Sequence, residues 1–133
     1  MHEVAEHDPR AVQGLPLQGP NQWPDAEVLP GFRETIEAYV EAMTVLGRKM
    51  ASAIAISLGL PADSLNRYFE DPTTFLRLLH YPPQPPEDGL FGSAPHTDYG
   101  FITLLAQDDV GGLEVLNKNG DWVAAPPVPG AFV

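Results

Sequence analysis

The stretch Ala94-Pro-His-Thr-Asp-Tyr-Gly-Phe-Ile-Thr-Leu-Leu105 places an imidazole and a carboxylate two residues apart at the start of an apolar run. Side chains at positions i and i+2 of a strand leave the same face, so His96 and Asp98 can converge on one ion. A proline precedes the pair, a glycine follows it, and β-branched, aromatic and aliphatic residues come next. This pattern predicts a buried strand over residues 101–107.

The chemistry of this pair favours a metal site. One imidazole and one carboxylate are two of the three ligands in the 2-His-1-carboxylate sites that bind non-haem Fe(II). The same two groups could instead bind zinc and activate water, as in a hydrolase. A His-x-Asp spacing also arises by chance in a chain with four histidines. The spacing alone therefore leaves these alternatives open.

Composition narrows the classes of function. The chain has 133 residues, of which 44% are apolar and 19% charged, as expected for one globular domain or part of one. A net charge of -11 repels nucleic acid and anionic membranes, so neither is expected as a partner. The chain contains no cysteine, no apolar run long enough to span a membrane and no basic, apolar leader. We therefore expect a soluble, cytoplasmic protein.

The first half of the chain is predicted to be extended and then helical. Five prolines within residues 1–31 exclude a long helix there and indicate an extended segment. From residue 32 to residue 58, apolar residues recur at three- and four-residue steps, as in an amphipathic helix. Gly59 and Pro61 should end it, and residues 61–69 favour a short second helix.

The second half is predicted to form strands. We expect strands over residues 73–81, 101–107, 113–117 and 121–125, with a hairpin at Asn119-Gly120. Helices followed by antiparallel strands indicate an α+β fold. Residues 131–133 have the composition of a further strand at its start, so we expect the chain to be a fragment cut inside a sheet.

Several motifs together point to a known family. The motifs are Leu76-Arg-Leu-Leu-His-Tyr-Pro-Pro83, Pro95-His-Thr-Asp98, Thr103-Leu-Leu-Ala-Gln-Asp108, Val110-Gly-Gly-Leu113, Gly120-Asp-Trp122 and Pro127-Val-Pro-Gly130. With these motifs, the chain resembles the isopenicillin N synthase-like family of Fe(II) and 2-oxoglutarate dependent dioxygenases. The motifs occur in family order and spacing over about residues 70–133, and residues 19–69 resemble the helical N-terminal region more loosely.

The resemblance implies a fold and an activity. The fold would be N-terminal helices packed on an incomplete double-stranded β-helix, or jelly roll. Residues 1–31 would be the extended proline-rich segment, 32–72 the helical region and 73–133 the first, truncated strands of the core. The activity would couple oxidative decarboxylation of 2-oxoglutarate by O2 to hydroxylation, desaturation or cyclisation of a small organic substrate.

The resemblance also implies roles for individual residues. His96 and Asp98 would be iron ligands, and no further catalytic residue is implied. The hydroxyl of Tyr81 would help to hold the co-substrate, although a tyrosine at a strand end can also simply pack. His80 alternates to the opposite face of the strand from Tyr81, which favours a structural histidine over a ligand.

Two family features are missing from these 133 residues. The distal histidine ligand and the Arg-x-Ser motif, which grips the far carboxylate of 2-oxoglutarate, both lie beyond Gly130 in the family, and no arginine follows Arg77 here. We therefore expect the fragment alone to be inactive. The alternative is a non-catalytic, truncated jelly-roll module that pairs through its open edge. The oligomeric state is left open.

Overall fold

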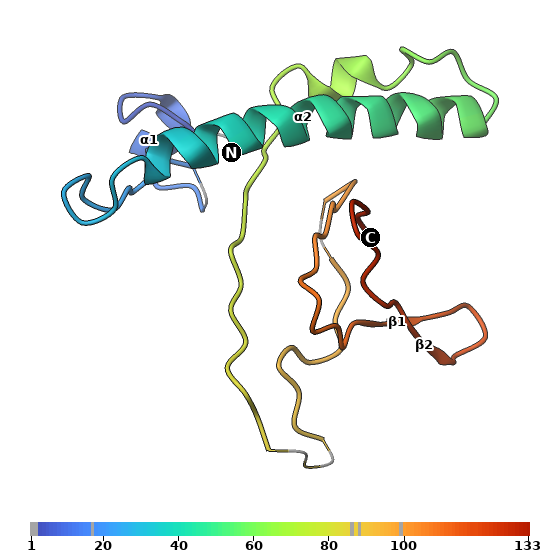
Figure 1. The fold of residues 1–133 in the computed structure, drawn as a ribbon. Coiled ribbons are helices and arrows are strands. Elements are labelled where there is room, and N and C mark those ends of the chain that lie inside the picture. The colour runs from blue at the N-terminus through green and yellow to red at the C-terminus, as the bar shows by residue number, and fades with distance from the viewer. Residues whose placement is uncertain (1–2, 17, 86, 88, 99) are drawn as a thin grey trace. The chain divides into compact units, whose positions relative to one another are not determined.

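The computed structural model describes residues 3–16, 18–85, 87, 89–98 and 100–133. The chain divides into two compact units, Met1–Gly92 and Ser93–Val133. Helices occur in the first unit and strands in the second. The elements in chain order are α1 (Pro9–Val12), α2 (Phe32–Ser57), the 3₁₀ helix η1 (Asn66–Phe69), β1 (Glu114–Leu116) and β2 (Trp122–Ala124) (Figure 1). Within the described ranges, no helix is both long and apolar enough to cross a membrane.

Helix α2 confirms the predicted amphipathic helix almost to the residue. It spans Phe32–Ser57 and ends at the predicted glycine, which has a φ of +73°. The amide of Leu60 donates to the carbonyl of Ala55 at 3.0 Å, and the amide of Gly59 donates to that of Ile56 at 2.9 Å. These two bonds make a Schellman motif, which satisfies carbonyls that the helix end would otherwise leave free. The end of α2 is therefore determined locally, by Gly59.

Two glycine substitutions in and after α2 should change stability in opposite directions. Gly59→Ala should lower the free energy of unfolding by about 1–2 kcal/mol, because it forces a Cβ into the left-handed region. Gly47→Ala should raise it by about 0.5–1 kcal/mol, because Gly47 lies inside the helix and an added Cβ there meets nothing within 4 Å. Urea denaturation of the full-length protein measures both. An unchanged or higher free energy of unfolding for Gly59→Ala would contradict the assigned helix end, and a lower one for Gly47→Ala would contradict its place inside the helix.

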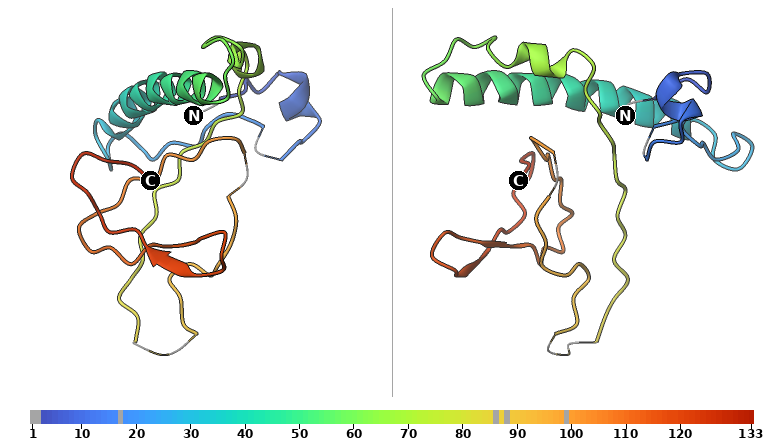
Figure 2. Two further views of the ribbon diagram at one scale, coloured as in Figure 1. Left: turned by 90° about the vertical axis from the view of Figure 1, so that its right-hand side faces the viewer. Right: turned by 180° about the vertical axis from the view of Figure 1, so that it is seen from behind.

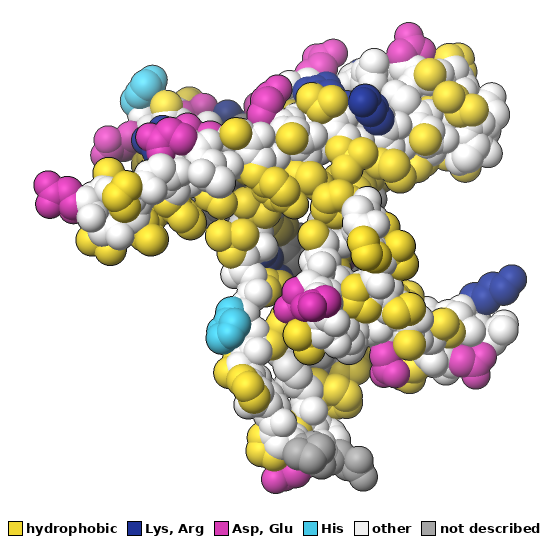
Figure 3. All heavy atoms as spheres, in the orientation of Figure 1, with side chains coloured by type: hydrophobic (Ala, Val, Ile, Leu, Met, Phe, Trp, Pro, Cys, Tyr) yellow, Lys and Arg dark blue, Asp and Glu magenta, His cyan; other side chains and the backbone are white. Residues whose placement is uncertain are grey.

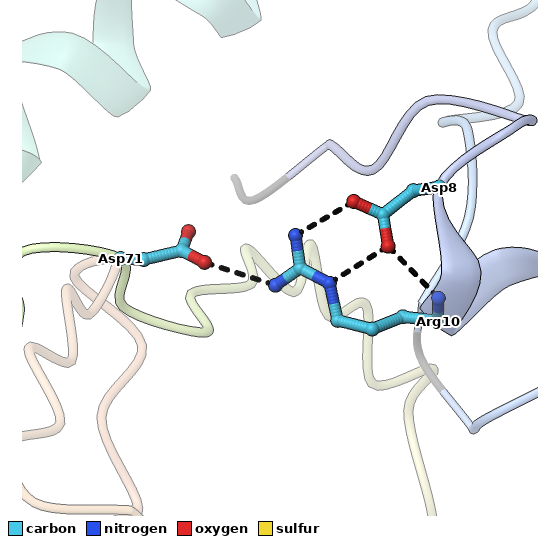
Figure 4. Close-up of polar contacts among 3 residues, drawn as sticks. All are labelled: Asp8, Arg10 and Asp71. Carbon is cyan, nitrogen blue, oxygen red and sulfur yellow. Dashed lines mark hydrogen bonds and ion pairs between the residues drawn. The ribbon is translucent and has the colours of Figure 1, made fainter.

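The N-terminal segment contains the single helical turn α1 and several hydrogen-bonded turns, such as that from the amide of Val28 to the carbonyl of Asp25 at 3.0 Å. Residues 1, 2 and 17 lie outside the described residues. Asp8 caps the turn α1 by accepting from the amide of Arg10 at 2.8 Å. The guanidinium of Arg10 donates two bonds of 3.0 Å to the Asp8 carboxylate and one of 3.0 Å to Asp71 (Figure 4). These contacts tie the segment to the chain just after η1, and the hydrogen bond to Asp8 raises the pKa of Arg10.

The predicted second helix over residues 61–69 forms only in part. Amides at residues 64, 66 and 68 each donate to the carbonyl three residues earlier, and Asn66–Phe69 is a 3₁₀ helix. Helix η1 lies beside α2 in all three views (Figures 1 and 2). Arg48 of α2 donates to the carbonyl of Phe69 at 3.0 Å. Ala51 and Ala55, which share this helix face by their spacing, are 3% and 0% exposed.

The predicted hairpin in the second unit is confirmed. Strands β1 and β2 are antiparallel, with Val115 opposite Val123. Additional bonds from Asn117 to Asp121 and from Ala125 to Leu113, each 2.9 Å, extend the pairing to the predicted bounds 113–117 and 121–125. In the turn, the side-chain oxygen of Asn117 accepts from two backbone amides, and Gly120 has a φ of +90°.

The predictions of strands over residues 73–81 and 101–107 are corrected by the structure. Residues 73–81 run extended in Figure 1, but no strand is assigned over 73–81 or 101–107 in the described part of the chain. A strand exists only where a neighbour supplies its hydrogen bonds. The 101–107 run pairs through Leu105, which exchanges both backbone bonds with Val133 at 2.9 and 3.0 Å. The detailed jelly-roll arrangement is therefore not confirmed by this structure.

Buried apolar side chains are few. Among the described residues, the fully buried hydrophobic ones are Val4, Ala51 and Ala55, and all three belong to the first unit. Hydrophobic side chains instead lie on the surface of both units, as the space-filling view shows (Figure 3). In the hairpin, Trp122 and Val123 are each about half exposed. The secondary structure is thus defined mainly by local hydrogen bonds.

Candidate metal centre

His96 and Asp98 come together in the second unit. The Nε2 atom of His96 lies 3.4 Å from the Oδ1 atom of Asp98. Both side chains are about half exposed, at 57% and 52%. The convergence expected from their i, i+2 spacing is therefore present, although the residues lie in an irregular segment rather than in a paired strand. Whether the pair binds iron stays a prediction.

The backbone holds the imidazole of His96 in one tautomer. Its Nδ1 lies 2.7 Å from the carbonyl oxygen of Ala94. A carbonyl can only accept, so Nδ1 carries the hydrogen and donates it. In the neutral ring, the lone pair is then on Nε2, the atom that faces the carboxylate. This arrangement is the usual way in which a protein orients a histidine that ligates a metal.

The pair fits a divalent metal ion. A neutral Nε2 and a carboxylate oxygen both present lone pairs, so both atoms can donate to a cation placed between them. Bonds from such ions to imidazole nitrogen and carboxylate oxygen are about 2.0–2.2 Å long. Twice that length exceeds the observed separation of 3.4 Å, so one ion can contact both atoms. Imidazole with carboxylate is also a donor set that suits Fe(II).

Among the described residues, no third protein ligand is found beside this pair. Within the described ranges, no group of three or more His, Cys, Asp or Glu side chains is arranged to hold a metal ion. His80 and Tyr81 are exposed and belong to the first unit, where the ring of Tyr81 lies against the backbone at Gly92. His96 and Asp98 are thus a partial ligand set.

A shallow hollow in the second unit was not predicted. It has a volume of about 300 Å³ and is lined by residues 110–114 and 124–127, beside the open end of the hairpin. An added Cβ at Gly111 would lie 3.3 Å from the Cδ atom of Pro127, so this glycine permits the close approach of the two segments. Glu114 is the single ionisable residue of the lining.

The observed site is a His-x-Asp pair whose two side chains lie within 3.4 Å of each other. Comparison with known families then gives the identification. Residues 64–133 match the 2OG-Fe(II) oxygenase superfamily, and the chain belongs to this family. The predicted resemblance is confirmed at this level. Membership implies a jelly-roll fold, with Fe(II) as the metal and 2-oxoglutarate and O2 as co-substrates.

Individual relatives agree with this family. The chain is 38% identical to a probable iron/ascorbate oxidoreductase of Dictyostelium discoideum, over 98% of this chain and 42% of the relative. It is 42% identical to a 2-oxoglutarate-dependent dioxygenase of Monascus ruber, with the same shares covered. It is 41% identical to a homoarginine-6-hydroxylase of Glycine max, over 90% of this chain and 38% of the relative. No solved structure matches. The chain spans about two fifths of the length of these relatives.

Proposed function

We propose that the protein is an Fe(II) and 2-oxoglutarate dependent oxygenase of a small organic substrate, with His96 and Asp98 as two of its iron ligands. The observation that carries the proposal is the 3.4 Å approach of two lone-pair donors, one of them a ring whose tautomer is set by the carbonyl of Ala94. The family match over residues 64–133 supports iron over zinc as the metal. The exposure of both side chains leaves room for further ligands.

In this proposal the residues of the chain bind and orient. His96 presents Nε2 and keeps its other nitrogen bonded to the backbone, which favours this orientation of the ring. Asp98 supplies a negative charge that favours a divalent cation, and the Tyr81 hydroxyl helps to hold the co-substrate. Bound Fe(II) supplies the activation of O2 that is coupled to decarboxylation of 2-oxoglutarate to succinate and CO2.

The remaining groups are proposed to come from outside these 133 residues. A third iron ligand is needed, and so is a cation for the far carboxylate of 2-oxoglutarate, for which a bidentate arginine is best suited. The curated relatives are more than twice as long as the aligned part, which supports this proposal. The ordered motifs of residues 76–130 support placement in the isopenicillin N synthase-like branch, where hydroxylation, desaturation and ring closure all remain candidate outcomes.

Anaerobic titration of the full-length protein tests the proposed function. Addition of Fe(II) and then 2-oxoglutarate should produce a weak visible charge-transfer band, because ferrous iron can donate an electron to the bound 2-oxo acid. Zn(II) in place of Fe(II) is the control and should give no band, since its filled d shell has no redox chemistry. Absence of the band with Fe(II), together with no consumption of 2-oxoglutarate in air, would reject the oxygenase.

A second candidate function is a non-catalytic interaction module. The two-stranded sheet of β1 and β2 favours it, because each strand has one neighbour in the described part of the chain and both are exposed. Such an edge can add a strand from another protein. This function predicts a stable oligomer that binds iron poorly, so the same titration separates the two candidates.

A further inference from the structure

The segment between Tyr81 and Gly92 folds back on itself within the first unit. The amide of Glu87 donates to the carbonyl of Pro85 at 2.8 Å, and the amide of Leu90 donates to that of Glu87 at 3.1 Å. Gly89 lies in the second of these turns with a φ of +82°. The reversal brings Gly92 against the side chain of Tyr81.

The contact between Gly92 and Tyr81 is close because Gly92 has no side chain. A Cβ added to Gly92 would lie 3.1 Å from Cδ1 of the Tyr81 ring, 3.5 Å from Cγ and 3.7 Å from Cβ. Optimal separations between carbon atoms are about 3.5–4.0 Å, so a methyl group there would compress the nearest contact. The Tyr81 ring thus packs directly against the backbone of Gly92.

The ring contact, rather than the backbone conformation, is what requires glycine at this position. Nine described glycines have a positive φ that disfavours other residues, and Gly92 is not among them. Alanine could therefore adopt the backbone conformation of Gly92 without strain. Its methyl group would instead meet the Tyr81 ring, which is 51% exposed and so has free space into which it can be pushed.

We infer that Gly92 is a positioning residue for Tyr81. The inference rests on the proposed function, in which the Tyr81 hydroxyl contacts 2-oxoglutarate. A hydrogen bond weakens when donor and acceptor leave their preferred distance and angle. Because it has no Cβ, Gly92 leaves free the space that the Tyr81 ring occupies, and the ring can keep this position.

The test compares Gly92→Ala with Tyr81→Phe in the full-length protein. Calorimetric titration with 2-oxoglutarate, without oxygen and with Mn(II) replacing Fe(II), measures binding without turnover. Each variant should bind 2-oxoglutarate about tenfold more weakly, the loss expected for one hydrogen bond to a charged group. The KM for 2-oxoglutarate should rise accordingly while kcat at saturation changes little. Gly19→Ala is the matched control, since its added Cβ meets nothing within 4 Å.

A double variant and a spectroscopic readout separate the outcomes. Gly92→Ala combined with Tyr81→Phe should bind no more weakly than Tyr81→Phe alone, because both changes remove the same contact. In protein labelled with 3-fluorotyrosine, the ¹⁹F resonance of Tyr81, assigned by its loss in Tyr81→Phe, should shift in Gly92→Ala. An unshifted resonance, or additive losses of affinity, would overturn the role of Gly92 alone. Failure of the unaltered protein to bind 2-oxoglutarate would overturn the proposed function and this inference with it.

Discussion

Replacing either His96 or Asp98 by alanine is expected to weaken Fe(II) binding by the full-length protein more than about 100-fold and to abolish consumption of 2-oxoglutarate. Loss of a group that merely orients a ligand already costs about 10–100-fold in metal affinity or activity, and loss of the ligand itself should cost more. The two substitutions should have similar effects, because the side chains face each other at 3.4 Å and would share one ion. Equilibrium dialysis with Fe(II) and an oxygen electrode provide the measurements.

Matched substitutions distinguish ligation from general damage. His80→Ala removes an exposed histidine of the first unit, and Asp109→Ala removes an exposed aspartate from the same unit as Asp98. Both control variants should bind Fe(II) and turn over 2-oxoglutarate within about twofold of the unaltered protein, as expected for surface positions. If His96→Ala and Asp98→Ala bind Fe(II) as tightly as the controls, the proposed metal centre is wrong.

Ala55→Asp is expected to lower the free energy of unfolding by about 3 kcal/mol or more. Ala55 is 0% exposed, on the face of α2 that also carries Arg48 and its bond to η1. A carboxylate there must leave water, which is costly when no partner is provided. Urea denaturation of the full-length protein, with the slope checked for two-state behaviour, measures the change.

Ala53→Asp is the control for this substitution. Ala53 lies on the same helix two residues earlier but is exposed, so its replacement costs mainly helix propensity, about 0.7 kcal/mol. The unfavourable interaction of a negative charge with the C-terminal end of α2 is nearly the same at both positions. The difference between the two variants therefore reports burial. Equal destabilisation would show that the face of Ala55 is not covered in the full-length protein.

The small number of buried side chains bears on how this chain is stabilised. Burial of apolar surface contributes about 25 cal/mol per Å² and is the dominant favourable term in folding. Here the described residues bury Val4, Ala51 and Ala55 and leave Leu78, Phe101 and Trp122 at least half exposed. We therefore expect burial of apolar surface to contribute little to the stability of these 133 residues when they are isolated.

The sequence by itself predicted those features whose determinants lie within a few residues of one another. The period of apolar residues with Gly59 predicted α2 and its end, Asn119-Gly120 predicted the hairpin, and the two-residue spacing predicted that His96 and Asp98 meet. Each depends on local hydrogen bonds or on the geometry of a single segment. The family could also be predicted from the sequence, because its motifs are short and occur in a fixed order along the chain.

Only the tertiary structure decided the features that depend on residues far apart in the chain. Strands expected over 73–81 and 101–107 are not assigned, because an apolar extended run does not specify its partner, and Leu105 pairs with Val133. The sequence also did not predict the 3₁₀ form of η1 or the packing of the Tyr81 ring on Gly92. A contact across a folded loop depends on the path of the backbone, and no spacing in the sequence encodes that path.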